Sequence, residues 1–326
     1  MKNMLIAGFA LAGLLGVVAA CKNEVPAAAN TATTAHDHAS GDHAHTYVCP
    51  MHPEAVSDQP GTCPKCKMSL EERHPEANPN RYEMRFTVPA GAIAGQEVLL
   101  TFKPGIKGNA NASVPLDIQH EKKIHLIIAS DDLGWFNHIH PAYQADGGYV
   151  VKTTFPAGGK YTLFADYKPT GADHQLEKIN LDVTGKPLPA KTWSAAKTTS
   201  TTADGYTVSL ESELGKFVDQ GETHIIAKVM KAGQEIRASQ LENYLGAKGH
   251  AVVVSTDSEK RYLHIHPGVE DDRLHLAASF GKPGIYRGWL QIQHAGKVQT
   301  ADFVLTVVEG NGETPVTEHA HEGHTH

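Results

Sequence analysis

The chain repeats itself, and this repeat restricts its possible folds more than any other feature. Residues 116–141 resemble residues 241–267, with His125 matching His250, 125 positions further on. Both segments end in the motif His-Ile-His-Pro, whose two copies lie 126 positions apart, so one residue has been inserted between them. Self-similarity at a fixed period indicates two copies of one structural unit. We therefore predict two tandem domains with the same fold.

Short strand-like runs separated by Gly, Pro, Asn and Asp occupy both copies, and helical periodicity is weak throughout. Apolar residues make up 40% of the 326 residues and charged residues 20%, which is enough apolar material for true cores. We predict a mainly β fold, in which two immunoglobulin-like β-sandwich domains follow a small Cys/His module. The net charge of −7 argues against a nucleic-acid-binding protein.

The N-terminus is typical of an export signal. Lys2 precedes an uncharged apolar run that ends at Cys21, with small residues just before the cysteine. The run Val18–Cys21 resembles the lipobox of bacterial lipoproteins, and this resemblance implies lipidation at Cys21 and a membrane-anchored protein of the cell envelope. The alternative is an uncleaved membrane anchor, although the run is short for a membrane span.

A cysteine cluster follows a His-containing polar tether. One pair of side chains has the spacing Cys-x2-His and the next has the spacing Cys-x2-Cys, so four ligands can surround one ion tetrahedrally. Two neighbouring thioethers add donors that favour a soft ion such as Cu(I). The expected ligands are Cys49, His52, Cys63 and Cys66, with Met51 and Met68 beside them. The alternative is a disulfide between Cys63 and Cys66, with Cys49 as the odd cysteine of the cluster.

These residues lie in YVCPMHP and PGTCPKCKM, a pattern that closely resembles the heavy-metal-binding domain of copper and silver P-type ATPases and of efflux-pump adaptors. The family's ligand positions fall on the four residues just named. Lys67 stands where the family has Gly. The rest of the chain lacks the hydrophobic helices of such an ATPase and the helical hairpin of such an adaptor.

Each β repeat also carries three histidines. In a strand, residues i and i+2 share a face, so the two histidines of each His-Ile-His-Pro motif project together, and Ile139 and Ile265 face the core. If the preceding strand pairs with this one, a third imidazole joins them, and three imidazoles suit Cu(II) or Zn(II). Asp132 or Asp257 would then orient a ring. The two sets are His125, His138 and His140 (the first triad) and His250, His264 and His266 (the second triad).

Two other interpretations of the triads remain open. In the first, the histidines only cap a sheet edge or bond neighbouring carbonyl groups. In the second, both repeats inherited the same three histidines from one ancestral domain, with no function attached. Further histidines flank the β repeats in polar segments that could hold Cu(II), Ni(II) or Zn(II) weakly. A cloning tag or a plain solvated tail would also explain the C-terminal set. These flanking histidines are His36, His38, His43, His45, His319, His321, His324 and His326.

We therefore expect a membrane-anchored lipoprotein of the cell envelope that binds heavy-metal ions. Copper, as Cu(I) or Cu(II), is the expected ion, with silver or zinc possible, and a heavy-metal efflux pump or copper chaperone is the expected partner. We expect no enzymatic activity. The alternatives are an envelope interaction scaffold whose metal is only structural and an enzyme that uses an open three-histidine site.

The predicted organisation has eight segments. They are a lipoprotein signal peptide (1–20), a His-rich tether (21–46), the heavy-metal-binding module (47–70), a linker (71–80), β repeat 1 (81–185), a second linker (186–200), β repeat 2 (201–309) and a His-rich tail (310–326).

Overall fold

The structure is a computed structural model, and it describes residues 46–49, 52–64, 70–73, 81–88, 90–109 and 111–310. The predicted signal peptide, the lipidation site Cys21 and the His-rich flanking segments lie outside the described residues. Among the residues that are described, no helix is long and apolar enough to cross a bilayer.

The N-terminal module is a small antiparallel sheet with the order β2-β1-β3. Strand β3 lies in the segment predicted as a linker from residue 71, so that boundary is wrong. The three residues of β3 are all charged, and they pair with β1 through backbone groups. Backbone pairing does not require apolar side chains, so no alternation of apolar residues marks this strand in the sequence. The strands are β1 (Thr46–Cys49), β2 (His52–Ser57) and β3 (Glu71–Arg73).

Repeat 1 consists of two four-stranded antiparallel sheets that enclose one apolar core. Leu100, Phe102 and Leu126 lie in this core and are fully buried. The first sheet contains, in order, β4 (Tyr82–Thr87), β5 (Glu97–Ile106), β9 (Tyr149–Thr154) and β8 (Ala142–Tyr143). The second contains β11 (Gln175–Val183), β10 (Gly159–Tyr167), β6 (Ile124–Ser130) and β7 (Phe136–Ile139).

Repeat 2 is a second two-sheet sandwich with its own core. Its first strand begins at Thr199, inside the segment predicted as the second linker. A 3₁₀ turn covers Ala238–Gln240. One sheet holds β12 (Thr199–Thr201), β13 (Tyr206–Ser212), β15 (Thr223–Lys231), β20 (Arg273–Ala278) and β19 (Gly268–Glu270), with β16 (Gln234–Ile236) beside β15. The other holds β14 (Phe217–Val218), β22 (Lys297–Val308), β21 (Gly284–His294), β17 (His250–Ser255) and β18 (Tyr262–Ile265).

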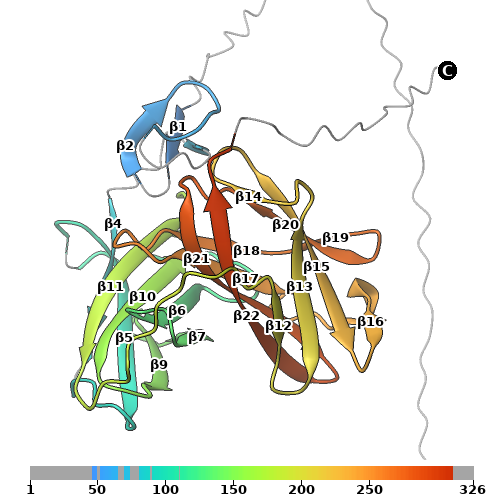
Figure 1. Cartoon of the computed structure of the whole chain (residues 1–326). Coiled ribbons are helices and arrows are strands. Elements are labelled where there is room, and N and C mark those ends of the chain that lie inside the picture. Colours follow the sequence, from blue (N-terminus) through green and yellow to red (C-terminus); the bar gives the residue numbers. More distant parts are fainter. Residues whose placement is uncertain are drawn as a thin grey trace, which may run out of the picture. The chain divides into compact units, whose positions relative to one another are not determined.

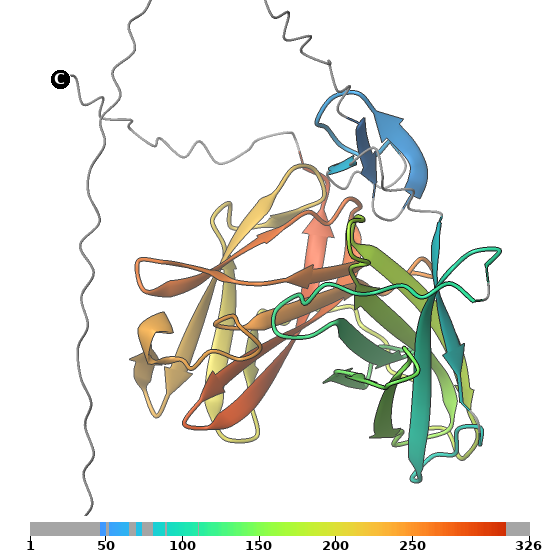
Figure 2. The ribbon, with the colours of Figure 1, turned by 180° about the vertical axis from the view of Figure 1, so that it is seen from behind.

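The prediction of a mainly β chain with two tandem sandwiches is confirmed, and both repeats can be followed in Figure 1 and Figure 2. Strand β13 alternates between buried and half-buried residues, as expected for a sheet with one face on the core. Strand β17, in contrast, is buried at every position, and β6 is buried at all but its last. These two strands must therefore have covered surfaces on both faces.

The second face of β6 and β17 is buried where the two repeats meet. Ile127 and Ala129 of repeat 1 join Val252 and Val254 of repeat 2 in a third apolar cluster. Two aromatic stacks belong to this interface, Phe136 on Trp289 with ring centroids 4.5 Å apart and Phe164 on Tyr262 at 4.9 Å.

The two stacks are equivalent under the sequence repeat. Trp289 is 125 positions after Phe164, and Tyr262 is 126 positions after Phe136. Each repeat therefore presents the same pair of positions to the other, which is the pattern of a twofold-symmetric interface. The interface joins the two β repeats in the manner of a dimer within one chain.

Candidate metal centre

The first triad gathers its three imidazoles at one point. Strand β6 pairs with β7, with Ile127 opposite His138. This places His125 Nδ1 3.2 Å from His138 Nε2, and His140 Nε2 lies 3.3 Å from the former and 3.2 Å from the latter. Metal–nitrogen bonds of about 2.0–2.1 Å in a tetrahedral site put ligand nitrogens about 3.3 Å apart. The three nitrogen atoms thus have the spacing of a coordination shell.

The second triad has the same construction. Strand β17 pairs with β18, and His250 Nδ1 lies 3.3 Å from His264 Nε2. The donor atoms of His250, His264 and His266 all lie within 4.8 Å of one another. The buried Nε2 atom of His266 has no hydrogen-bond partner among the described residues. The prediction that each strand pair brings three imidazoles together is consistent with this geometry, and Ile139 and Ile265 face their cores as expected.

The two triads are not separate, because they lie against each other at the interface between the repeats. The donor atoms of His125, His138 and His264 also lie within 4.8 Å of one another, although His264 belongs to repeat 2. The rings of His125 and His250 stack with centroids 5.8 Å apart. Six imidazoles therefore form one cluster, which we call the histidine centre.

The outer ring nitrogens of the histidine centre contact backbone carbonyl groups of the same repeat and side chains of the other repeat. His125 Nε2 is 2.9 Å from the carbonyl oxygen of Gln119, and His250 Nε2 is 2.9 Å from that of Tyr244. The alternative that histidines bond neighbouring carbonyls is therefore correct for the outer nitrogen of these two rings. Their Nδ1 atoms face the centre.

Two hydrogen bonds to imidazoles of the centre cross from one repeat to the other. His138 Nδ1 lies 2.8 Å from Gln291 Oε1, and His264 Nδ1 lies 3.0 Å from Asp166 Oδ2. Gln291 is 125 positions after Asp166, so the two contacts are equivalent under the repeat. Each repeat thus orients an imidazole of the other repeat, as buried acceptors commonly do for metal-ligating histidines.

Five of the six histidines of the centre have a pKa well below the ordinary value for histidine. Burial lowers the pKa of His125 to about 4, and burial with neighbouring imidazoles lowers the pKa of His140 and His250 to about 3 and that of His138 and His266 to about 2. Burial alone would raise the pKa of Asp166, but the His264 hydrogen bond and nearby imidazoles hold it below its ordinary value. The site therefore offers neutral nitrogen donors and one carboxylate, which suits a cation.

Three residues around the centre were not predicted. Asp166 and Gln291 lie on strands β10 and β21, and the exposed ring of His120 stacks on His266 with centroids 3.5 Å apart. An Asp that follows the apolar run Tyr161–Ala165 is a signal that could have pointed to Asp166, since a buried carboxylate needs a partner. No such signal exists for Gln291 or His120.

The prediction that Asp132 or Asp257 orients a ring is wrong. Asp132 Oδ1 accepts hydrogen bonds from Ser130 Oγ and the Gly134 amide, and Asp132 Oδ2 accepts one from the Lys191 amide. Asp257 likewise accepts from Ser255 Oγ and pairs with the buried Arg261. Both aspartates follow a serine by two residues in a turn, and this local arrangement already satisfies the carboxylate.

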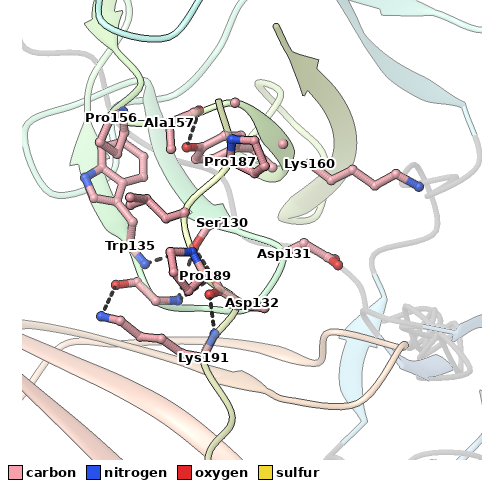
Figure 3. Close-up of a pocket in the computed structure, with 16 residues that line it drawn as sticks. Ser130, Asp131, Asp132, Trp135, Pro156, Ala157, Lys160, Pro187, Pro189 and Lys191 are labelled. Carbon is pink, nitrogen blue, oxygen red and sulfur yellow. Dashed lines mark hydrogen bonds between the residues drawn. The ribbon is translucent and has the colours of Figure 1, made fainter. Parts of the chain in front are cut away.

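Asp132 instead holds the second linker against repeat 1. Figure 3 shows Lys191 and Pro189 beside the turn from Ser130 to Trp135, at a cavity of about 280 Å³. The indole nitrogen of Trp193 donates to the carbonyl oxygen of Asp132 at 2.6 Å. This cavity is lined by prolines, Trp135 and backbone, and it contains none of the centre's histidines.

Replacing Asp132 with alanine should therefore lower stability without affecting metal binding. We expect the free energy of unfolding to fall by about 1–2 kcal/mol, because two half-buried donors and the exposed Lys191 amide lose their acceptor. Asp146→Ala, which removes one turn contact at an exposed site, should change it by less than about 0.5 kcal/mol. Denaturant unfolding and copper titration of both variants measure this. If Asp132→Ala bound one copper ion fewer per chain, Asp132 would orient a ring of the centre after all.

The structure describes only part of the predicted thiolate site. Cys49 and His52 are paired backbone positions of the β1–β2 hairpin, and Cys63 is fully buried. The amide of Leu70 donates to the carbonyl oxygen of Gly61. Cys66, Met51 and Met68 lie outside the described residues.

Comparison with known proteins supports the assignment of the module. A family model described as a heavy metal binding domain matches residues 46–73. A copper-transporting P-type ATPase from Rhizobium leguminosarum bv. viciae is 76% identical over 25 residues, which cover 8% of this chain and 3% of the ATPase. The chain thus contains a heavy-metal-binding domain that it shares with a much longer protein.

Similarity to solved structures is low. Escherichia coli alpha-2-macroglobulin activated by porcine elastase has a TM-score of 0.24 at 12% identity, over 70% of this chain and 20% of that one. A putative membrane anchored protein from Corynebacterium diphtheriae has a TM-score of 0.20 at 13% identity, over 71% and 60%. Scores of this size do not establish a shared fold.

The β repeats match a family model of their own. The model, described as a domain of unknown function (DUF8832), matches residues 77–184 and again residues 200–309. The two matches contain the first and second triads respectively. Since this model covers well over half of the chain in two consecutive copies, the chain belongs to the DUF8832 family.

Proposed function

We propose that the protein is a membrane-anchored lipoprotein of the cell envelope that captures copper and passes it to a partner. The observation that carries this proposal is the occurrence, in one chain, of a heavy-metal-binding domain and a cluster of six imidazoles. Thiolates suit Cu(I) and imidazoles suit Cu(II) or Zn(II), so the chain can accept copper in either oxidation state.

The proposed route begins at the membrane. Lipid on Cys21 would tether the chain, the His-rich flanking segments would raise the local ion concentration, and the module at residues 47–70 would take up the soft ion. An efflux pump or a copper chaperone would be the acceptor. The proposal includes no enzymatic activity, since a carrier only needs to bind and release its ion.

Metal stoichiometry tests this function. The mature lipid-free chain and its Cys63→Ser/Cys66→Ser variant would be loaded with Cu(I) and with Cu(II) in the presence of a competing chelator. We expect the variant to lose tight Cu(I) binding by the module, because two thiolates are removed, and to keep Cu(II) binding at the histidine centre. Unchanged Cu(I) affinity in the variant would remove the module from the proposal.

An envelope scaffold with a structural metal is the second candidate, and the extensive apolar interface between the repeats favours it. A scaffold would hold one zinc ion tightly, take up no copper, and leave metal tolerance unchanged when its gene is deleted. Sensitivity of the deletion strain to copper would exclude it.

A further inference from the structure

The partners of four imidazoles at the histidine centre fix which ring nitrogen faces inward. The carbonyl oxygens beside His125 and His250 can only accept, so both rings donate from Nε2 and point an unprotonated Nδ1 inward. Asp166 likewise accepts from His264 Nδ1, so the other ring nitrogen of His264, Nε2, faces inward.

Gln291 has the same effect on His138. Its Oε1 atom accepts from His138 Nδ1 at 2.8 Å, and its Nε2 atom donates to Thr300 Oγ1 at 3.2 Å. His138 therefore donates from Nδ1 and points an unprotonated Nε2 inward. Four rings thus direct a nitrogen atom into one small volume, and three of these atoms carry a lone pair.

Nitrogen atoms this close repel each other unless a proton or a cation lies between them. His125 Nδ1 and His138 Nε2 are 3.2 Å apart, and a single proton on His140 Nε2, which is 3.3 Å from the first and 3.2 Å from the second, can bond only one of them at full strength. His250 Nδ1 and His264 Nε2 are 3.3 Å apart. The buried, unpartnered Nε2 of His266 adds a further donor with nothing to bond. The arrangement is satisfied by one ion in each triad.

We propose that the two triads form a single two-ion copper centre shared by both repeats, which fills in a fixed order. This inference rests on the proposed metal-binding function and extends it to the number, position and order of the ions. The donor atoms of His125, His138 and His264 lie within 4.8 Å of one another across the interface, so the ions would be close neighbours.

The order follows from an asymmetry between the otherwise equivalent halves. The second triad is oriented by the carboxylate of Asp166, whereas the first triad is oriented by the neutral amide of Gln291. The ammonium group of Lys122 acts on His140 of the first triad, and the equivalent position in repeat 2 is Ala247. Charge therefore favours a cation at the second triad and opposes one at the first.

The first ion consequently binds at the second triad, beside the carboxylate. The second ion must enter next to an existing positive charge with no further carboxylate to offset it, so it binds more weakly. The stacked ring of His120 lies over His266 at the exposed side of the centre.

Cu(II) titration followed by electron paramagnetic resonance tests the centre in the full mature chain carrying Cys63→Ser/Cys66→Ser, with copper supplied as its glycine chelate. We expect the first equivalent to give an ordinary mononuclear spectrum. The second should remove intensity and add a half-field line, because two neighbouring spins couple. Two additive mononuclear spectra would overturn the proposal.

Two matched substitutions test the order of filling. Asp166→Asn should weaken the first binding step about 10–100-fold, as loss of an orienting partner does at metal-bound histidines, and leave the second step nearly unchanged. Gln291→Glu should strengthen the second step by a similar factor. Equal effects on both steps, or none, would contradict the fixed order.

The results also separate this proposal from the function on which it rests. If the parent chain binds Cu(I) at its thiolates but the histidine centre takes up no Cu(II), the proposed function stands and the two-ion centre is wrong. If neither part binds copper, the proposed function is wrong.

Discussion

Trp289→Ala should lower the free energy of unfolding by about 4 kcal/mol and uncouple the two halves of the histidine centre. Trp289 is 5% exposed, stacks on Phe136 of the other repeat, and contributes no metal ligand. Its removal opens the interface, while each triad keeps its own three histidines within one repeat. We therefore expect two copper ions to bind still, but without the spin coupling of neighbouring ions.

Leu305→Ala is the matched control for this loss of coupling. Leu305 is buried in the core between the two sheets of repeat 2 and does not belong to the interface cluster. We expect it to lower the free energy of unfolding by about 3 kcal/mol and to leave the coupling unchanged. Denaturant unfolding and resonance spectra of both variants measure the difference. Coupling that survives in Trp289→Ala would show that the interface does not hold the triads together.

His264→Ala should have the largest effect of any single histidine substitution. The variant loses a donor of the second triad and also removes the nearest partner of Asp166, a residue that is 6% exposed and that keeps contacts with Tyr262 and His174. Loss of a hydrogen bond to a buried carboxylate is costly, so we expect a loss of about 2 kcal/mol in the metal-free protein, together with loss of the copper equivalent that binds first.

His140→Ala separates these two effects. His140 Nε2 faces only His125 and His138, and no carboxylate depends on it. This variant should lose the copper equivalent that binds second, at a stability cost of about 1 kcal/mol. Denaturant unfolding without metal and Cu(II) titration would be run on both. Equal losses of stability would mean that Asp166 does not depend on His264.

Much of the fold could be predicted from local pattern. Turn residues and strand-like runs identified the strands, and the repeat identified two copies of one sandwich. The period of two along a strand correctly placed the histidines of each motif on one face and Ile139 and Ile265 in the core. These features depend on residues that are near one another in the sequence.

The predictions that failed concern residues that come together only through contacts between the repeats. Each triad was predicted as a separate site, because nothing in a strand pattern reveals which outer face will meet another domain. The continuous burial of β6 and β17 was visible as apolar runs, but such runs fit any fully covered strand. Asp132 was predicted to orient a ring although its turn already satisfies it, and Asp166 was not predicted.

The crossed contacts of Asp166 and Gln291 have a consequence for the evolution of such a chain. Two identical subunits around a twofold axis would carry either two carboxylates or two amides at these positions, and their ion sites would be equal. A fused pair is free of that constraint, because each copy can mutate alone. With Asp in one copy and Gln in the other, the joined chain has inequivalent sites that a homodimer of a single repeat cannot have.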